Sequence, residues 1–208
     1  MIDKENMFHA LQNDLFLQTT DPFQICGIDE AGRGPLAGPV YAAAVVLPEH
    51  FPFSILDDSK KLSEKERLSA ETIIKAQSVA WSVSFATHVE IDHLNILQAT
   101  MLAMKRSIEK IDSSLFSAVL VDGNKVPILD DRSKLITPII KGDSLIPQIM
   151  AASILAKNAR DRFMCFCDRK WPEYGYARHK GYPTARHFEA IAQYGPSPIQ
   201  RMSFNCFK

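Results

Sequence analysis

The sequence predicts a single α/β domain. Short segments typical of strands alternate along the chain with longer segments whose apolar residues recur at helical spacing. A chain of 208 residues with 46% hydrophobic and 23% charged residues suits one globular domain of ordinary composition. The sequence contains no internal repeat and no low-complexity segment, and no apolar run reaches the roughly 20 residues that cross a membrane.

The first half of the chain is expected to form a helix, two strands joined by a glycine-rich turn, a second helix and a third strand. Apolar residues at helical spacing predict a short packing helix over residues 5–18. Ser63 and Glu66 have the spacing of a capping box, which opens a helix that ends near residue 77. The strands of this half are expected at residues 24–28, 40–47 and 81–87.

The second half combines long helices with two short strands. A helix is expected over residues 90–111, which have helical apolar spacing and contain no glycine or proline. Pro147 is tolerated in the first turn of a long helix over residues 144–169. The remaining segments are strands at residues 118–121 and 135–140, turns at residues 171–183 and a last helix at residues 184–194.

Three of the predicted strands end in acidic residues. Asp29 and Glu30 end the first strand, and Asp122 and Asp143 end the two short strands of the second half. One strand-terminal aspartate is usually a turn former or a helix cap. Three such ends in one domain favour a site, because ligands of open α/β sheets gather at the carboxyl ends of the strands. Four oxygen ligands without histidine or cysteine select Mg²⁺ or Mn²⁺ over Zn²⁺.

Asp161 competes with Asp143 for the last position in this set of acids. The helix between them would separate the two residues by about 27 Å, whereas two metal ions in one site lie about 4 Å apart. Asp143 lies at a strand end like the other acids, so it is the predicted ligand. Asp161 is predicted to pair with a nearby arginine instead.

The turn after the first strand is rich in glycine and contains Arg33. Its spacing resembles a P-loop that lacks the Lys-Ser/Thr ending, and Gly32, Gly34 and Gly38 loosely resemble a dinucleotide-binding loop. Either loop would place a bare phosphate beside the two acids of the strand, which would repel it. A cation that bridges acid and phosphate removes this objection, so the turn is interpreted as part of a metal and phosphate site.

The net charge of the chain is zero, but the charge is unevenly distributed. Residues 157–208 contain 10 Lys and Arg against 4 Asp and Glu, a balance of +6, and the rest of the chain has a balance of −6. The basic quarter either holds a polyanion near an acidic, metal-binding site or only covers a solvated helix face. Charge alone does not decide between the two interpretations.

Cysteine usage and the N-terminal residues indicate the compartment. The four cysteines form neither a CxxC pair nor a zinc-binding spacing, so reduced thiols are expected at Cys26, Cys165, Cys167 and Cys206. The first residues lack the basic-then-apolar order of a secretory signal. A cytoplasmic protein is therefore expected.

These motifs together resemble those of ribonuclease HII, the type 2 ribonuclease H family. The resemblance runs from about residue 26 to residue 204, and its HKGYPT segment favours the bacterial form. The matching segments are residues 27–40 (GIDEAGRGPLAGPV), 58–62 (DSKKL), 121–124 (VDGN), 141–143 (KGD), 151–157 (AASILAK), 160–161 (RD) and 179–184 (HKGYPT).

The resemblance implies a ribonuclease H-like mixed five-stranded sheet flanked by helices, with a helical C-terminal region. One domain would span residues 1–208, with residues 1–20 as an N-terminal extension and residues 171–208 as the approximate substrate-binding helical segment. The implied activity is that of a metal-dependent endonuclease in DNA replication and repair. It would cleave RNA paired to DNA and nick duplex DNA on the 5′ side of a single ribonucleotide.

The resemblance also implies roles for individual residues. The catalytic acids, which would also bind Mg²⁺ or Mn²⁺, are Asp29, Glu30, Asp122 and Asp143. The backbone of Gly32, Arg33 and Gly34 would read the ribose 2′-OH, and Tyr182 would pack on the deoxyribose that follows the ribonucleotide. The cations expected to contact phosphate without reading sequence are Lys60, Lys61, Lys141, Lys180 and Arg186.

This assignment agrees with the chemistry expected of the acids. One ion would lower the pKa of a water and aim it at phosphorus, and a second would stabilise the leaving 3′ oxygen. The products would be a 5′-phosphate on the ribonucleotide and a 3′-OH upstream. Because clustered carboxylates raise one another's pKa, metal affinity and activity are expected to rise with pH.

The sequence departs from the family pattern at two places that leave catalysis untouched. Residues 200–204 (QRMSF) replace a more usual HRRSF, which affects a secondary contact with the duplex. Asn158 stands where a small apolar residue is commoner, and the sequence suggests no function for it.

Two other functions fit parts of the pattern. Ribonuclease HIII, the sister type, prefers longer hybrid stretches and usually has an extra N-terminal domain, for which this chain has no room. A hybrid-binding module without catalysis would not need all four acids. No sliding-clamp peptide is expected, because residues 205–208 (NCFK) lack a glutamine followed by spaced aliphatic and aromatic residues. A monomer is expected.

Overall fold

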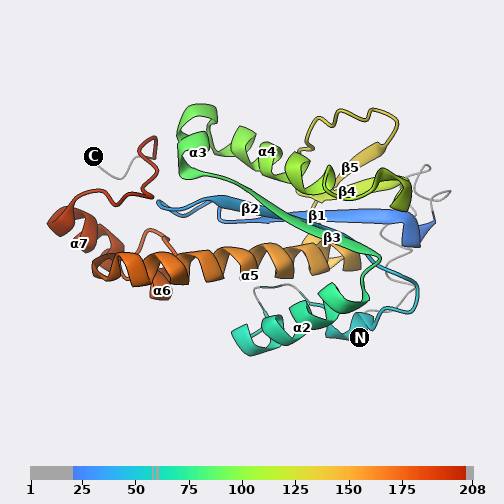
Figure 1. Ribbon diagram of the computed structural model, residues 1–208, viewed down its shortest axis with the longest axis horizontal. Helices are drawn as coiled ribbons and strands as arrows, with labels where there is room; N and C mark the ends of the chain where they lie inside the picture. Colours follow the sequence, from blue (N-terminus) through green and yellow to red (C-terminus); the bar gives the residue numbers. More distant parts are fainter. Residues whose placement is uncertain (1–20, 58, 60, 205–208) are drawn as a thin grey trace.

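The computed structural model describes residues 21–57, 59 and 61–204, and in them a five-stranded mixed sheet lies between two layers of helices (Figure 1). The strand order is β3-β2-β1-β4-β5. Strand β1 pairs antiparallel with β2 and parallel with β4, while β2–β3 is antiparallel and β4–β5 is parallel. The strands are β1 (Ile25–Ala31), β2 (Val40–Val46), β3 (Ala80–Ala86), β4 (Ala118–Asp122) and β5 (Leu135–Ile139).

Helices cover both faces of the sheet (Figure 1). Helix α4 packs on β2 and β3 at one face, with α3 beside it, and the long helix α5 packs on β1 and β2 at the other face, with α2 against its outer side. The helices of the two layers are α2 (Glu64–Gln77), α3 (His88–Leu94), α4 (Ile96–Ile108) and α5 (Pro147–Lys170), and the C-terminal region adds α6 (Tyr176–His179) and α7 (Ala185–Tyr194).

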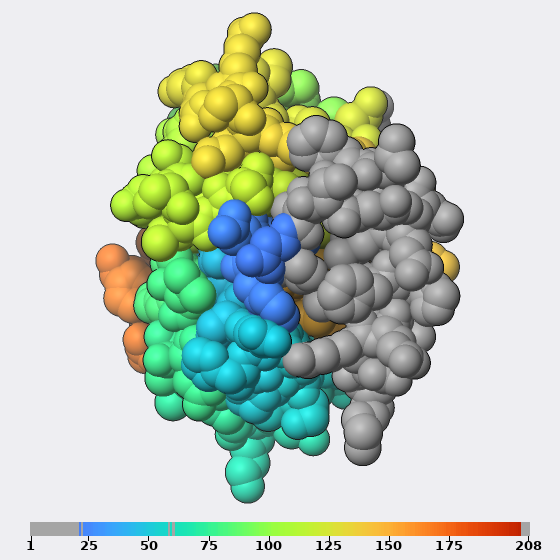
Figure 2. Space-filling model, turned by 90° about the vertical axis from the view of Figure 1, so that its right-hand side faces the viewer, coloured from blue at the N-terminus to red at the C-terminus, as the bar shows by residue number. Residues whose placement is uncertain are grey.

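Within the described residues, five 3-10 helices connect these elements. They are η2 (Pro22–Gln24), η3 (Phe53–Ile55), η4 (Ser113–Leu115), η5 (Gly142–Ser144) and η6 (Pro172–Tyr174). At one end of the molecule, the start of β1 lies between the segment that follows α4 and the turn that follows β2 (Figure 2). The backbone N–H of Ser117 donates to the carbonyl of Gln24 at this end, over 2.8 Å.

The strands bury alternate side chains in two separate cores, as a sheet covered on both faces must. Cys26 and Ile28 of β1 belong to the core beneath α4. Ala43 and Val45 of β2 belong to the core beneath α5. Gly27 allows α5 to lie directly on β1, since a Cβ at this glycine would be 2.3 Å from the carbonyl carbon of Gln148.

Most sequence expectations for these elements are confirmed. The capping box opens α2, with the side chain of Ser63 bonded to the N–H of Glu66 and the side chain of Glu66 bonded to the N–H of Ser63. Pro147 is the first residue of α5. The helix expected over residues 5–18 lies outside the described residues. In the part of the chain that the structure describes, no helix has both the length and the apolar character needed to cross a bilayer.

The prediction of one continuous helix over residues 90–111 was wrong. Asn95 has a φ of 70° and separates α3 from α4. It ends α3 and also caps α4, because its side-chain oxygen accepts a hydrogen bond from the N–H of Gln98. Asparagine tolerates positive φ better than most residues, so the break needs neither the glycine nor the proline whose absence suggested continuity.

Candidate active site

The three strand ends bring four acids to one edge of the sheet. Asp29 and Glu30 lie near the end of β1, Asp122 ends β4, and Asp143 lies in η5 directly after β5. Strands β1, β4 and β5 are parallel neighbours, so their carboxyl ends open in the same direction. All four acids line one pocket of about 230 Å³.

Asp29 is a buried acid whose negative charge is unfavourable in this pocket. Only 5% of the residue is exposed. Burial, followed by the negative charges of Glu30 and Asp122, raises the pKa of Asp29 well above its usual range. Hydrogen bonds from Ser153 and from the N–H of Glu30, the latter 2.6 Å long, lower the pKa of Asp29 and so offset part of this rise. The carboxylate is therefore poorly stabilised by the protein and gains from a neighbouring cation.

The acids also contact their surroundings within the protein. Glu30 accepts a hydrogen bond from Nη1 of Arg33 over 3.4 Å, and Asp122 accepts one from the backbone N–H of Asp143 over 3.2 Å. In the described ranges no three carboxylate, imidazole or thiol groups are close enough together, as they stand, to coordinate a metal ion. The pocket thus gathers oxygen ligands at one place without fixing them around a single point.

The glycine-rich turn forms a second wall of the pocket, next to the acids. Gly32, Arg33 and Gly34 all line it, together with Tyr182 from the C-terminal region. Gly32 has a φ of 98°, and a Cβ added there would lie 2.0 Å from Nε of Arg160. Gly34 has ordinary backbone geometry, and the nearest atom to a Cβ there is Cε1 of Tyr182 at 3.5 Å. The first glycine is needed for the fold of the turn, whereas the second keeps its surface open.

A buried arginine from α5 holds this turn by hydrogen bonds to its backbone. Arg160 is only 1% exposed and donates to the carbonyl oxygens of Ala37 at 3.1 Å and Pro39 at 3.2 Å. Its Nη1 also donates to the carbonyl of Lys180 at 2.9 Å. The guanidinium therefore ties the glycine-rich turn to the segment that carries Tyr182.

A second buried arginine, Arg201, holds the same turn from the C-terminal side. Its side chain donates to the carbonyl oxygens of Gly32 at 2.5 Å, Arg33 at 2.9 Å and Gly38 at 2.8 Å. Burial lowers the pKa of Arg201 to about 9 and that of Arg160 to about 10. Burying two cations is costly unless their donors are satisfied, and here the carbonyls of the turn satisfy them.

The predicted phosphate-binding cations that the structure describes do not line the pocket. Lys60 is outside the described residues, and Lys61 is exposed and paired with Asp57 at 3.3 Å. The ammonium group of Lys180 donates to the carbonyl of Ala177 and to Sγ of Cys165. Lys141 and Arg186 are exposed. Of these five cations, the four that the structure describes are not among the residues that line the pocket.

Five further residues that line the pocket have no role predicted from the sequence. They are Ala31, Ser59, Ser153, Lys157 and Arg160. The hydroxyl groups of Ser59 and Ser153 are 2.8 Å apart, and Ser153 in turn bonds to Asp29. On α5, Ser153 and Lys157 are four residues apart, a spacing that places them on one helix face. That spacing, joined to the expected long helix, was the signal available in the sequence.

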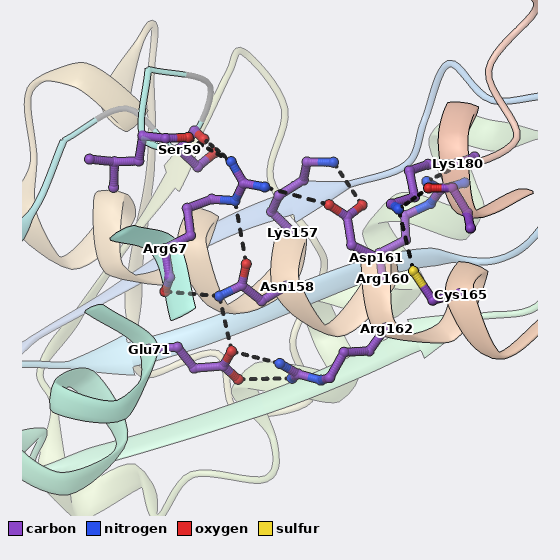
Figure 3. Close-up of polar contacts among 12 residues, drawn as sticks. Ser59, Arg67, Glu71, Lys157, Asn158, Arg160, Asp161, Arg162, Cys165 and Lys180 are labelled. Atoms are coloured by element: carbon purple, nitrogen blue, oxygen red, sulfur yellow. Dashed lines mark hydrogen bonds and ion pairs between the residues drawn. The ribbon is translucent and has the colours of Figure 1, made fainter. Parts of the chain in front are cut away.

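Asp161 behaves as predicted, because it pairs with an arginine. Its Oδ2 lies 3.8 Å from Nη2 of Arg67, and its Oδ1 accepts a hydrogen bond from Lys157 over 2.7 Å. Asn158, for which the sequence suggested no function, joins α5 to α2 (Figure 3). Its amide group donates to the carbonyl of Arg67 at 3.0 Å and to Glu71 at 2.9 Å.

The sheet topology, with acids at the ends of three adjacent strands, defines a protein with the ribonuclease H-like fold. The family model described as Ribonuclease HII matches residues 26–207. Ribonuclease HII of Dechloromonas aromatica is 54% identical over 86% of this chain and 90% of its own length. Ribonuclease HII of Treponema denticola is 51% identical over 86% of this chain and 97% of its own. The chain belongs to the ribonuclease HII family and is a ribonuclease H, a hydrolase whose substrates are RNA:DNA hybrids.

Solved structures agree with this fold. The ribonuclease H2 of Pyrococcus horikoshii has a TM-score of 0.71 and 26% identity, covering 88% of this chain and 94% of its own. Ribonuclease HII of Archaeoglobus fulgidus, solved as a complex with PCNA, also has a TM-score of 0.71, with 23% identity over 87% and 95% of the two chains. Bst-RNase HIII, solved in complex with Mn²⁺, has a TM-score of 0.73 at 17% identity, covering 91% and 69%.

Proposed function

We propose that this protein is a metal-dependent endoribonuclease that also nicks duplex DNA on the 5′ side of a single embedded ribonucleotide. The observation that carries the proposal is the composition of the pocket. Four acids form one wall, and a glycine-rich backbone turn with an exposed tyrosine forms the other. The first wall suits phosphodiester hydrolysis and the second suits recognition of a ribose, so both tasks fall on the same nucleotide.

The acids fit Mg²⁺ or Mn²⁺ by the chemistry of their donors. Asp29, Glu30, Asp122 and Asp143 supply only carboxylate oxygens, which hard divalent cations prefer. Burial and then the negative charges of Glu30 and Asp122 raise the pKa of Asp29, and a divalent cation would offset that negative charge. When bound, such ions supply Lewis-acid activation of water and of the leaving 3′ oxygen. A structural neighbour in complex with Mn²⁺ is consistent with this cofactor.

The remaining residues of the pocket bind and orient the substrate. Gly32 and Gly34 carry no side chain, so the backbone between them can approach the 2′-OH, the group that distinguishes RNA from DNA. Tyr182 is 44% exposed beside Gly34, where its ring can pack on the deoxyribose that follows. The expected products are a 5′-phosphate on the ribonucleotide and a 3′-OH on the upstream strand.

The cellular context follows from the same activity. We infer a monomeric, cytoplasmic enzyme of one domain that removes ribonucleotides during DNA replication and repair. The archaeal neighbour in complex with PCNA raises the question of a sliding clamp. The tail expected to lack a clamp peptide, residues 205–208, lies outside the described residues. A pull-down with clamp protein that survives deletion of residues 200–208 would show that the expectation of no clamp partner, which was made from the tail alone, is incomplete.

The decisive experiment uses a labelled DNA duplex that contains one ribonucleotide, incubated with Mg²⁺, with Mn²⁺ and with EDTA. A single nick 5′ to the ribonucleotide, abolished by EDTA, is the expected result. Cleavage only within runs of several ribonucleotides would indicate the specificity of the sister type, ribonuclease HIII. Binding of the duplex without cleavage in either metal would indicate a hybrid-binding module.

A further inference from the structure

The pocket contains a cation that its acids do not hold. Arg33 forms an ion pair with Glu30 within the pocket. Arg160 donates its hydrogen bonds to backbone carbonyls. Lys157 differs from both, because Asp161, with which it forms an ion pair, is not among the residues that line the pocket. The side chain of Lys157 is 28% exposed, so solvent reaches part of it.

We propose that Lys157 binds a phosphate of the cleaved strand and that Asp161 is the positioning residue that holds it away from the catalytic acids. This inference rests on the proposed function. Lysine is a flexible point charge, and four carboxylates in the same pocket are its natural partners. An ammonium group bound to those carboxylates would occupy oxygens that the divalent ions need. The hydrogen bond of 2.7 Å to Asp161 provides a competing partner on the same helix.

The position of Asp161 is itself fixed by a network between α2 and α5 (Figure 3). Arg67 of α2 contacts Asp161, and it also donates to the carbonyl of Leu62 at 2.7 Å and to Oδ1 of Asn158 at 3.4 Å. Asn158 returns a hydrogen bond to the carbonyl of Arg67 at 3.0 Å. Asp161 therefore presents its carboxylate from a supported position, as a residue that aims another side chain must.

The charges of this group suit a phosphate. Arg67 and Lys157 carry two positive charges, and Asp161 carries one negative charge, so the three together have a net charge of +1. Asp161 thus neutralises only part of the positive charge next to the pocket. A phosphate of the bound strand can approach Lys157 from the pocket side while Asp161 stays on the helix side.

Mn²⁺ binding in the absence of substrate tests the positioning role directly. Free Mn²⁺ can be counted by electron paramagnetic resonance in titrations of the wild type, Asp161→Asn, Lys157→Met and the double variant. We expect Asp161→Asn to weaken Mn²⁺ binding about tenfold, because the released ammonium group pairs with the acids. The double variant should recover the wild-type affinity, since it lacks the competing cation.

Glu109→Gln is the matched control. Lys105 of α4 and Glu109, the residue that follows this helix, form a pair of the same spacing at 3.6 Å, and neither lines the pocket. This variant changes the net charge by the same amount as Asp161→Asn, so any long-range electrostatic effect appears in both. We expect Glu109→Gln to bind Mn²⁺ as the wild type does.

Kinetics with the ribonucleotide-containing duplex test the phosphate contact. Lys157→Met should raise KM about tenfold with a smaller change in kcat and reduce the slope of log affinity against log salt by about 0.9, and Lys157→Arg should restore KM. If the wild type and the Asp161→Asn variant bind Mn²⁺ equally well, this inference is overturned, but the proposed function is not. Failure of the double variant to recover affinity, or an unchanged KM in Lys157→Met, would also overturn it. A folded wild type that binds no Mn²⁺ would overturn the proposed function as well.

Discussion

The two walls of the pocket are built in different ways. The acids belong to the ends of three adjacent strands, so the hydrogen-bonded register of β1, β4 and β5 places them. The glycine-rich turn has no such frame and is held by Arg160 and Arg201, which are more than 100 residues further along the chain. We therefore expect the acid wall to tolerate substitution without unfolding, while the turn depends on distant residues for its shape.

Loss of one acid should produce the largest change in activity. Asp122→Asn removes a charge that raises the pKa of Asp29. We expect cleavage of the ribonucleotide-containing duplex in Mg²⁺ to fall at least about a thousandfold, while the melting temperature stays the same or rises because repulsion is relieved. Glu189→Gln, an exposed acid of α7, is the control for loss of one negative charge. A variant that nicks at the wild-type rate would contradict the catalytic role of the acids.

Loss of a bracing arginine should act mainly on stability. Arg201→Met leaves the carbonyls of Gly32, Arg33 and Gly38 without their donor. We expect the free energy of unfolding, measured in urea, to fall by about 3 kcal/mol or more, with activity falling in parallel as the turn loses its shape. Arg178→Met removes an exposed cation of the same region and should change stability little. An unchanged urea midpoint in Arg201→Met would show that the turn holds its shape unaided.

The two glycines of the turn should separate folding from recognition. Gly32→Ala introduces a Cβ at positive φ, 2.0 Å from Arg160, and should cost about 3 kcal/mol of stability. Gly34→Ala meets only Tyr182 at 3.5 Å and should stay within about 1 kcal/mol of the wild type. Urea unfolding of both variants measures the difference. Equal destabilisation by the two substitutions would contradict the distinction between them.

A pair that does not line the pocket should show the smallest effect. The hydrogen bond from Arg106, at 2.7 Å, is the main reason that the pKa of Glu90 falls from 4.5 to about 2. Because the pKa is lowered in the folded state, the stability from this group is present above pH 4.5 and is lost as pH falls toward about 2. The pair is partly exposed and contributes at most about 1 kcal/mol.

Thermal unfolding at two pH values checks this contribution. Glu90→Gln should melt below the wild type at pH 7, and the gap should close near pH 2. A gap that is the same at both pH values would show that loss of the Glu90 charge does not explain the difference.

The same contrast explains what the sequence could and could not predict. Strand-terminal acids are visible in sequence because the strand pattern and the acid are adjacent, and the capping box of Ser63 and Glu66 is equally local. The break at Asn95 was missed because a single asparagine gives a weaker signal than glycine or proline. The carbonyl contacts of Arg201 depend on the tertiary fold, and no spacing in the sequence encodes them.

Surface cations were the least predictable part of the site. Lys180 was expected to contact phosphate, which stays a prediction, and in the structure its ammonium group donates to Ala177 and Cys165. Lys157, which received no role, lines the pocket instead. Lysine side chains are long and flexible, so their direction is decided by neighbours that become adjacent only in the folded chain.

The central claim is that the acids cut while the glycine-rich turn recognises the ribonucleotide. The most direct test compares Asp122→Asn with the double variant Asp122→Asn/Gly34→Ala. Each would be titrated in Mg²⁺ with a DNA duplex containing one ribonucleotide and with the same duplex made only of DNA. The account predicts that Asp122→Asn prefers the ribonucleotide-containing duplex and that adding Gly34→Ala removes the preference. A preference that survives in the double variant would contradict the account.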